Sequence, residues 1–193
     1  MPDSPRSEAS ARVRSPLVLT VLAAIAVVAI TTVGGLFFFA RQQPLPSSTS
    51  TATPKLMGEA VPMGQATHVT SPTALEVAPG MPPSGGPHFA QPLSAGVASA
   101  PVSDWNAIHS LEHGLVWITY RADLIAAADL ATLTAVARAH PRDVILSPRP
   151  ENSTAATVVS WGRRLVLPTP VVRDTVEAFV TTNLDQSPEP GVR

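Results

Sequence analysis

The chain has 193 residues and a formal charge of only −1 at neutral pH, from 13 Lys and Arg against 14 Asp and Glu. Its basic residues are scattered, which excludes the concentrated positive surface that nucleic-acid binding requires. It contains no Cys, so a disulfide framework, a thiolate metal site and a Cys nucleophile are all excluded, and any metal would need His, carboxylate, Met or water as ligands.

Residues 17–40 form an apolar stretch without a charged residue. At about 1.5 Å per residue it is long enough to cross a hydrocarbon core of roughly 30 Å, so it predicts one helix that spans a lipid bilayer. The stretch is longer than the apolar region of a signal peptide and lacks a small-x-small cleavage site, so we expect it to be retained. Arg6, Arg12 and Arg14 precede it, and this positive-inside bias predicts that residues 1–16 are a cytoplasmic tail. We therefore expect a single-pass protein of a bacterial cell membrane, with its C-terminal part outside the cytoplasm.

Residues 41–66 are rich in Pro, Ser and Thr and almost without large apolar residues. Such a composition cannot bury enough surface to offset the entropy of ordering, so we expect a semi-extended stalk. Residues 67–193 remain as one extracytoplasmic domain. Its first part, 68–100, is dense in Pro and Gly and predicts an irregular loop.

A helix followed by a strand is predicted after this loop. Ser103 is suited to cap a helix over 104–113, and Gly114 suits the left-handed position just past its end. Residues 115–120, Leu-Val-Trp-Ile-Thr-Tyr, are apolar, β-branched and aromatic, which predicts a buried strand.

The second half of the domain predicts two further helices and more strands. Asp123 is expected to cap a helix over 124–140 that Pro141 closes. The remaining elements are a strand at 144–146, a hairpin of 156–161 and 164–167 around Gly162-Arg163, and a helix over 169–182 opened by Thr169 and Pro170. This order predicts a small single α+β domain with a mixed or antiparallel sheet of three to five strands and two or three helices, preceded by the transmembrane helix.

The string His109-Ser110-Leu111-Glu112-His113 is the most informative for chemistry. Two His four residues apart on a helix lie on one face, so both imidazoles can reach one metal ion. The spacing also fits the H-x-x-E-H pattern of inverted zinc proteases, in which the Glu is the general base. Those enzymes carry the motif inside a long buried helix, whereas Gly114 and a predicted strand follow here at once. We favour a non-enzymatic site and keep Glu112 as the one catalytic alternative.

His68 and His88 lie in the Pro-rich loop, from which they could converge on the predicted helix. A purely structural interpretation competes with metal binding. In it, backbone carbonyls or Glu112 satisfy the His side chains of the helix, and His88 caps a turn.

Five strings in a fixed order carry a resemblance to a known family: Pro82-Pro83-Ser84-Gly85-Gly86-Pro87-His88, His109-Ser110-Leu111-Glu112-His113-Gly114 with Val116 and Tyr120, Ser147-Pro148, Trp161-Gly162-Arg163 and Pro188-Glu189-Pro190-Gly191. From His68 to the C-terminus the chain resembles the bacterial domain-of-unknown-function family numbered 3105. Members of that family are mostly membrane-anchored or exported and have no established activity. The resemblance implies a shared site built from His68, His88, His109, Glu112 and His113. Members often have a Tyr where this chain has Ala98, and some carry a Cys nearby, so a site that used either group would be altered here.

Three functions remain open. The first is a metal-binding module with His109 and His113 as paired ligands, His88 or His68 completing the sphere, and Glu112 ligating or orienting. Imidazoles without thiolate suit zinc or copper(II), with copper preferred outside the cytoplasm, and Met81 would add a soft ligand for copper(I) if it came near. The second is a non-catalytic structural or interaction domain of the cell envelope, and the third is a metal hydrolase that uses Glu112. The sequence indicates no particular protein partner.

Overall fold

A computed structural model describes residues 55–192, so the predicted cytoplasmic tail (1–16), the predicted transmembrane helix (17–40) and most of the predicted stalk lie outside the described residues. Within 55–192 no helix is long and apolar enough to cross a membrane. This part of the chain contains three helices, α2 (Asp104–Glu112), α3 (Ala127–Ala139) and α4 (Arg173–Asn183).

Two sheets accompany the helices. The larger has six strands in the order β1 (Glu59–Ala60), β8 (Arg163–Val166), β7 (Ala156–Ser160), β5 (Val116–Tyr120), β6 (Val144–Pro148) and β4 (Gly96–Val97). Strand β6 is parallel to both β5 and β4, whereas the β5–β7, β7–β8 and β1–β8 pairs are antiparallel. The smaller sheet is a parallel pair of two-residue strands, β2 (His68–Val69) and β3 (His88–Phe89).

The predicted α+β domain with a mixed sheet is confirmed, but the large sheet of residues 55–192 has six strands and not three to five. The additional edge strands β1 and β4 have two residues each and come from segments rich in Pro and Gly. Backbone hydrogen bonds hold these strands in the sheet. Two residues are too few to show the alternation of apolar and polar side chains by which a strand is predicted from sequence.

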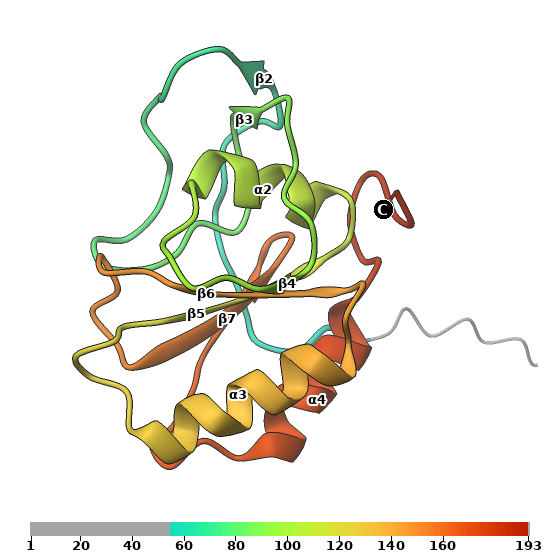
Figure 1. Cartoon of the computed structure of the whole chain (residues 1–193). Coiled ribbons are helices and arrows are strands. Elements are labelled where there is room, and N and C mark those ends of the chain that lie inside the picture. The colour runs from blue at the N-terminus through green and yellow to red at the C-terminus, as the bar shows by residue number, and fades with distance from the viewer. Residues whose placement is uncertain (1–54, 193) are drawn as a thin grey trace, which may run out of the picture. The chain divides into compact units, whose positions relative to one another are not determined.

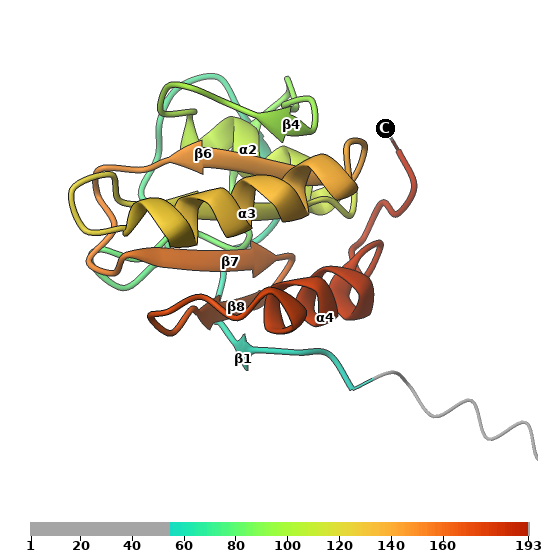
Figure 2. The same cartoon turned by 60° about the horizontal axis from the view of Figure 1, so that its bottom comes forward.

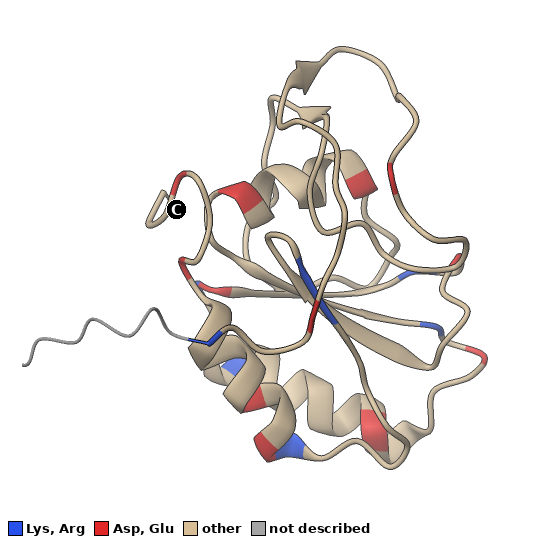
Figure 3. Ribbon diagram, turned by 180° about the vertical axis from the view of Figure 1, so that it is seen from behind, with Lys and Arg blue, Asp and Glu red and all other residues tan. Residues whose placement is uncertain are grey.

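Helices cover the large sheet on both faces. Figure 1 shows α3 and α4 on one face and α2 on the other, and the turned view of Figure 2 shows α3 and α4 side by side across the strands. Side chains alternate along β5, so Val116 and Ile118 pack in the core beneath α3 and α4, while Trp117 packs against α2. Burial of both faces explains why β5 reads as a continuous apolar run. Figure 3 shows the Lys and Arg residues spread over several elements.

Helix α2 has the predicted ends. The Ser103 hydroxyl accepts a hydrogen bond from the Asn106 N–H at 3.4 Å, which confirms the cap. Gly114 has φ +93° directly after the helix, and a Cβ there would lie 2.6 Å from Asp185 Oδ1. Glycine is therefore required where α2 turns into β5, and the HxxEH string stops at the end of a short helix.

The other two helices begin later than predicted. Asp123 does not cap α3, because its carboxylate accepts hydrogen bonds from Arg121 at 2.8 and 3.0 Å, and the helix begins at Ala127. Helix α4 begins at Arg173, and Thr169 and Pro170 form a cis peptide in the preceding turn. The Asp129 carboxylate, in the first turn of α3, accepts the Val171 N–H at 2.8 Å and so joins α3 to the segment before α4.

The structure places the turn of the hairpin and the start of the domain slightly earlier in the chain than predicted. The β7–β8 turn is Trp161-Gly162, one residue earlier than expected, with Ser160 opposite Arg163. The domain also begins before residue 67, because β1 pairs with β8 and the Met57 N–H donates to the Asn183 side chain at 2.9 Å. Part of the expected stalk is thus an edge of the sheet, held by backbone hydrogen bonds that its polar composition did not indicate.

Candidate metal centre

Two buried imidazoles are oriented by backbone carbonyls. His88 Nδ1 donates to the Gly86 carbonyl at 2.9 Å, and His109 Nδ1 donates to the Phe89 carbonyl at 2.7 Å. A carbonyl can only accept, so Nδ1 must carry the proton in each ring, and in the neutral ring Nε2 then holds a lone pair. Locking Nδ1–H on a carbonyl is the usual way in which proteins orient a metal-binding His.

Four predicted site residues place their ligand atoms close to one another, beside the Nε2 atoms of His88 and His109. His68, His88, His109 and Glu112 each offer one ligand atom, and these atoms all lie within 4.8 Å of one another. Strand pairing places His68 directly opposite His88, and the ring centroids of both lie 4.9 to 5.0 Å from that of His109. Segments more than forty residues apart thus supply one group, which we call the four-donor group and which could hold a metal ion.

Burial makes the four-donor group electrostatically unusual. His88, His109 and Glu112 are at most 8% exposed, whereas His68 is exposed. Burial lowers the pKa of His109, and its His neighbours lower it further against the opposing hydrogen bond to Phe89, which favours the neutral ring that a metal requires.

The contact between His88 and Glu112 is the most informative in the group. His88 Nε2 lies 3.0 Å from Glu112 Oε2, yet among the buried atoms of residues 55–192 it has no hydrogen-bond partner, because the approach lacks hydrogen-bond geometry. A buried ring nitrogen that lies close to a carboxylate oxygen and has no hydrogen-bond partner is unfavourable unless a proton or a metal cation satisfies both atoms.

His113 flanks the four-donor group and is not part of it. Its Nε2 lies 3.0 Å from His109 Nε2 and 3.4 Å from Glu189 Oε2. Since His109 carries its proton on Nδ1, the hydrogen bond between the two rings requires His113 Nε2–H to donate to His109 Nε2. His109 and His113 therefore lie on one face of α2, as predicted. The Nε2 lone pair of His109 accepts a hydrogen bond from His113 and is also the atom that His109 offers to the four-donor group.

A small cavity of about 170 Å³ opens onto the group and is lined by Ala66, Thr67, His68, His88, Glu112 and Glu189. Glu189 is a site residue that motif reasoning missed. Its only signal in the sequence was its place in the Pro188–Gly191 string. The Glu189 N–H donates to the Glu112 carbonyl at 3.1 Å, which holds the C-terminal segment against the end of α2 (Figure 1).

The Pro82–His88 loop has a tightly packed turn that positions His88. Gly86 has φ +116°, and a Cβ on Gly85 would collide with the Met63 sulfur. Gly86 is therefore required by its backbone conformation and Gly85 by its packing against the Met63 side chain, and the Gly86 carbonyl is the acceptor for His88 Nδ1. The turn holds the His88 ring in place.

A buried ion pair fixes the other end of α2. Arg149 donates to both carboxylate oxygens of Asp104, at 3.0 and 2.8 Å, and its remaining nitrogen donates to Asn152. The Arg149 side chain is 8% exposed. This fork joins the helix that carries His109 and Glu112 to the sheet.

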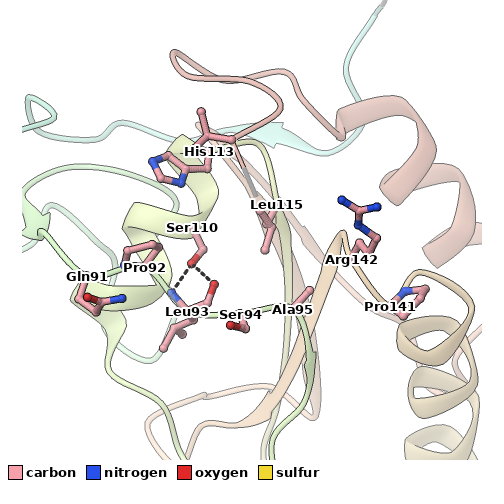
Figure 4. A pocket seen from close by; sticks show the side chains of 11 residues that line it. Gln91, Pro92, Leu93, Ser94, Ala95, Ser110, His113, Leu115, Pro141 and Arg142 are labelled. Atoms are coloured by element: carbon pink, nitrogen blue, oxygen red, sulfur yellow. Dashed lines mark hydrogen bonds between the residues drawn. The ribbon is translucent and has the colours of Figure 1, made fainter.

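A larger cavity of about 370 Å³ lies beside the group (Figure 4). Of the predicted site residues only His113 lines it. The Ser110 hydroxyl in this cavity accepts from the Leu93 N–H at 2.8 Å and donates to its carbonyl at 3.1 Å, so it ties a loop to α2 and is not a poised nucleophile.

Two other residues of interest lie apart from the group. Ala98 donates its N–H to the Leu146 carbonyl beside β4 and lines a separate cavity with Val102 and Ile145. Met81 is not among the residues that line the small cavity of the described structure. The departure at Ala98 therefore leaves the four-donor group unchanged.

The family model described as "Protein of unknown function (DUF3105)" matches residues 68–193. No curated protein and no solved structure matches the chain.

Proposed function

The chain belongs to the DUF3105 family, and we propose that it is a metal-binding protein whose site takes zinc or copper(II) through His68, His88, His109 and Glu112. The close approach of His88 Nε2 to Glu112 Oε2 without a hydrogen bond carries the proposal. Two acceptors held 3.0 Å apart in a buried place are the arrangement that a shared cation stabilises.

The distances support one ion. Two ligands at about 2.0–2.1 Å from a tetrahedral zinc ion lie roughly 3.3 Å apart, close to the His88–Glu112 separation. No two ligand atoms of the group lie more than 4.8 Å apart, so the donor–donor separations need to shorten by at most about 1.5 Å on binding. His68 is exposed on a two-residue strand and is the ligand with freedom to make that movement.

The donor types support the choice of metal. Three imidazoles and one carboxylate suit zinc or copper(II), whereas calcium and magnesium prefer sites made of oxygen donors. Glu112 lies within the donor group, which supports its role as a ligand over that of the general base in a hydrolase. In a purely structural domain the same contact would need a proton on His88 Nε2 to pair with Glu112, and the hydrogen-bond geometry for that pairing is absent.

Elemental analysis of the full-length protein, purified without a metal-affinity step, tests this function. We expect about one zinc or copper ion per chain, or uptake of about one equivalent by the chelated protein, because the ligands are largely preformed. Folded protein that takes up neither ion would leave the envelope interaction domain as the better account.

The apolar residues 17–40 support a location for this site outside the cytoplasm, on a single-pass bacterial membrane protein. Protease added to intact spheroplasts should then degrade the C-terminal domain. Its survival until the membrane is permeabilised would contradict this orientation.

A further inference from the structure

The C-terminal strap, residues 185–191, carries a donor that the proposed site does not yet use. We infer that Glu189 is a further metal ligand and that metal binding closes the strap over the site. This inference rests on the proposed function.

The strap is tied to the helix that carries the ligands. The Asp185 N–H donates to the Gly114 carbonyl at 3.0 Å, directly after α2, and the Glu189 N–H donates to the carbonyl of the ligand Glu112 at 3.1 Å. The Gly191 N–H donates back to Asp185 Oδ1 at 3.0 Å, which closes the strap into a loop. These backbone hydrogen bonds therefore fix the strap next to the residues of the proposed metal site.

The Glu189 carboxylate faces the ligands. It lines the small cavity together with His68, His88 and Glu112, and its Oε2 lies 3.4 Å from His113 Nε2. The side chain is 57% exposed, so little packing restrains it from reaching into the cavity.

His113 gives Glu189 a reason to move when a metal binds. In the described structure the His113 Nε2–H points to the His109 lone pair. A metal that takes this lone pair removes the acceptor that the His113 Nε2–H uses in the described structure, and one oxygen of the neighbouring Glu189 carboxylate can accept that N–H instead. The other oxygen is then free to ligate the ion, so a single carboxylate satisfies both groups without any change in the number of protons.

Without a bond from Glu189 to a metal ion, the strap is weakly held. Residues 188–192 are all exposed and contribute nothing to the apolar core, so they depend on the hydrogen bonds given above. Segments of this kind open locally at low cost, and one added ligand bond shifts their equilibrium strongly.

Hydrogen exchange measured by mass spectrometry on the full-length protein tests the strap. With EDTA, and then with Zn²⁺ and Cu²⁺ in parallel, we expect a saturating ion to slow exchange in the 184–193 peptide by roughly tenfold. In Glu189→Gln this slowing should be lost while metal stoichiometry is kept. Glu151→Gln, an exposed carboxylate on the loop before β7, is the matched control and should behave as the unchanged protein.

The outcomes separate the two proposals. Unchanged metal-dependent protection of the strap in Glu189→Gln would overturn the role of Glu189 and leave the metal site intact. Failure of the unchanged protein to bind either ion would overturn the proposed function instead.

Discussion

Changing His88 and His109 together to Ala is expected to weaken zinc or copper(II) binding by at least about a thousandfold, because the two buried lone pairs supply about half of the binding free energy of a four-ligand site. Isothermal titration of the chelated protein would measure the loss. The variant should also lose the metal that the unchanged protein retains through purification. These two rings matter most because their Nδ1 atoms are already oriented by carbonyls.

The His140→Ala variant is the matched control for this experiment. His140 ends α3 and donates to Glu177 on α4 at 2.6 Å, on the opposite face of the sheet from α2, so its loss should leave metal affinity unchanged. A second double variant, His88→Gln with His109→Gln, keeps polar side chains of similar size and separates loss of ligands from loss of folding. Metal binding that persists in a folded form of either double variant would exclude the four-donor group as the site.

Changing Arg149 to Met is expected to lower the free energy of unfolding by about 3 kcal/mol, because it leaves the Asp104 carboxylate without its buried partner. Asn152 loses a partner as well. Urea denaturation followed by tryptophan fluorescence would measure the change, and all three Trp residues of the chain lie within the described domain, so the signal reports that domain alone.

The Arg138→Met variant tests whether charge loss alone has this effect. Arg138 is exposed on α3, and its change should alter stability by no more than about 0.5 kcal/mol. Because Asp104 is the first residue of α2, Arg149→Met should also weaken metal binding through movement of His109 and Glu112. Equal stability of the two Arg variants would show that the fork contributes nothing measurable to the fold.

The site owes its geometry to backbone groups as much as to its ligands. Gly86, Phe89 and Glu112 each use a carbonyl, to orient His88, to orient His109 and to hold the C-terminal strap. Carbonyls are present at every residue, so no residue type marks these positions in a sequence. The contacts of Gly86 and Phe89 nevertheless decide which ring nitrogen is available to a metal.

Several elements could be predicted because local chemistry specifies them. Strand β5 is read from its apolar, β-branched run, and α2 from the Ser103 cap and the Gly114 terminus, each of which depends on neighbours within a few residues. The start of α3 at Ala127 was missed because the Asp123 carboxylate binds Arg121, and α4 begins at Arg173, beyond Thr169 and Pro170. A cap signal fails where another side chain binds the carboxylate.

By itself, the sequence determined the α+β class, the main helices and central strands, and the His and Glu residues worth examining, because periodicity, caps and short motifs act over a few residues. Only the tertiary structure decided that β2 pairs with β3, that His68 joins His88, His109 and Glu112, that His113 stands beside them, and that Glu189 returns from the C-terminus. These contacts join segments dozens of residues apart through backbone hydrogen bonds and a few side chains. Such pairings leave no periodic trace in the chain, since the contacting segments are short and their register is set by packing.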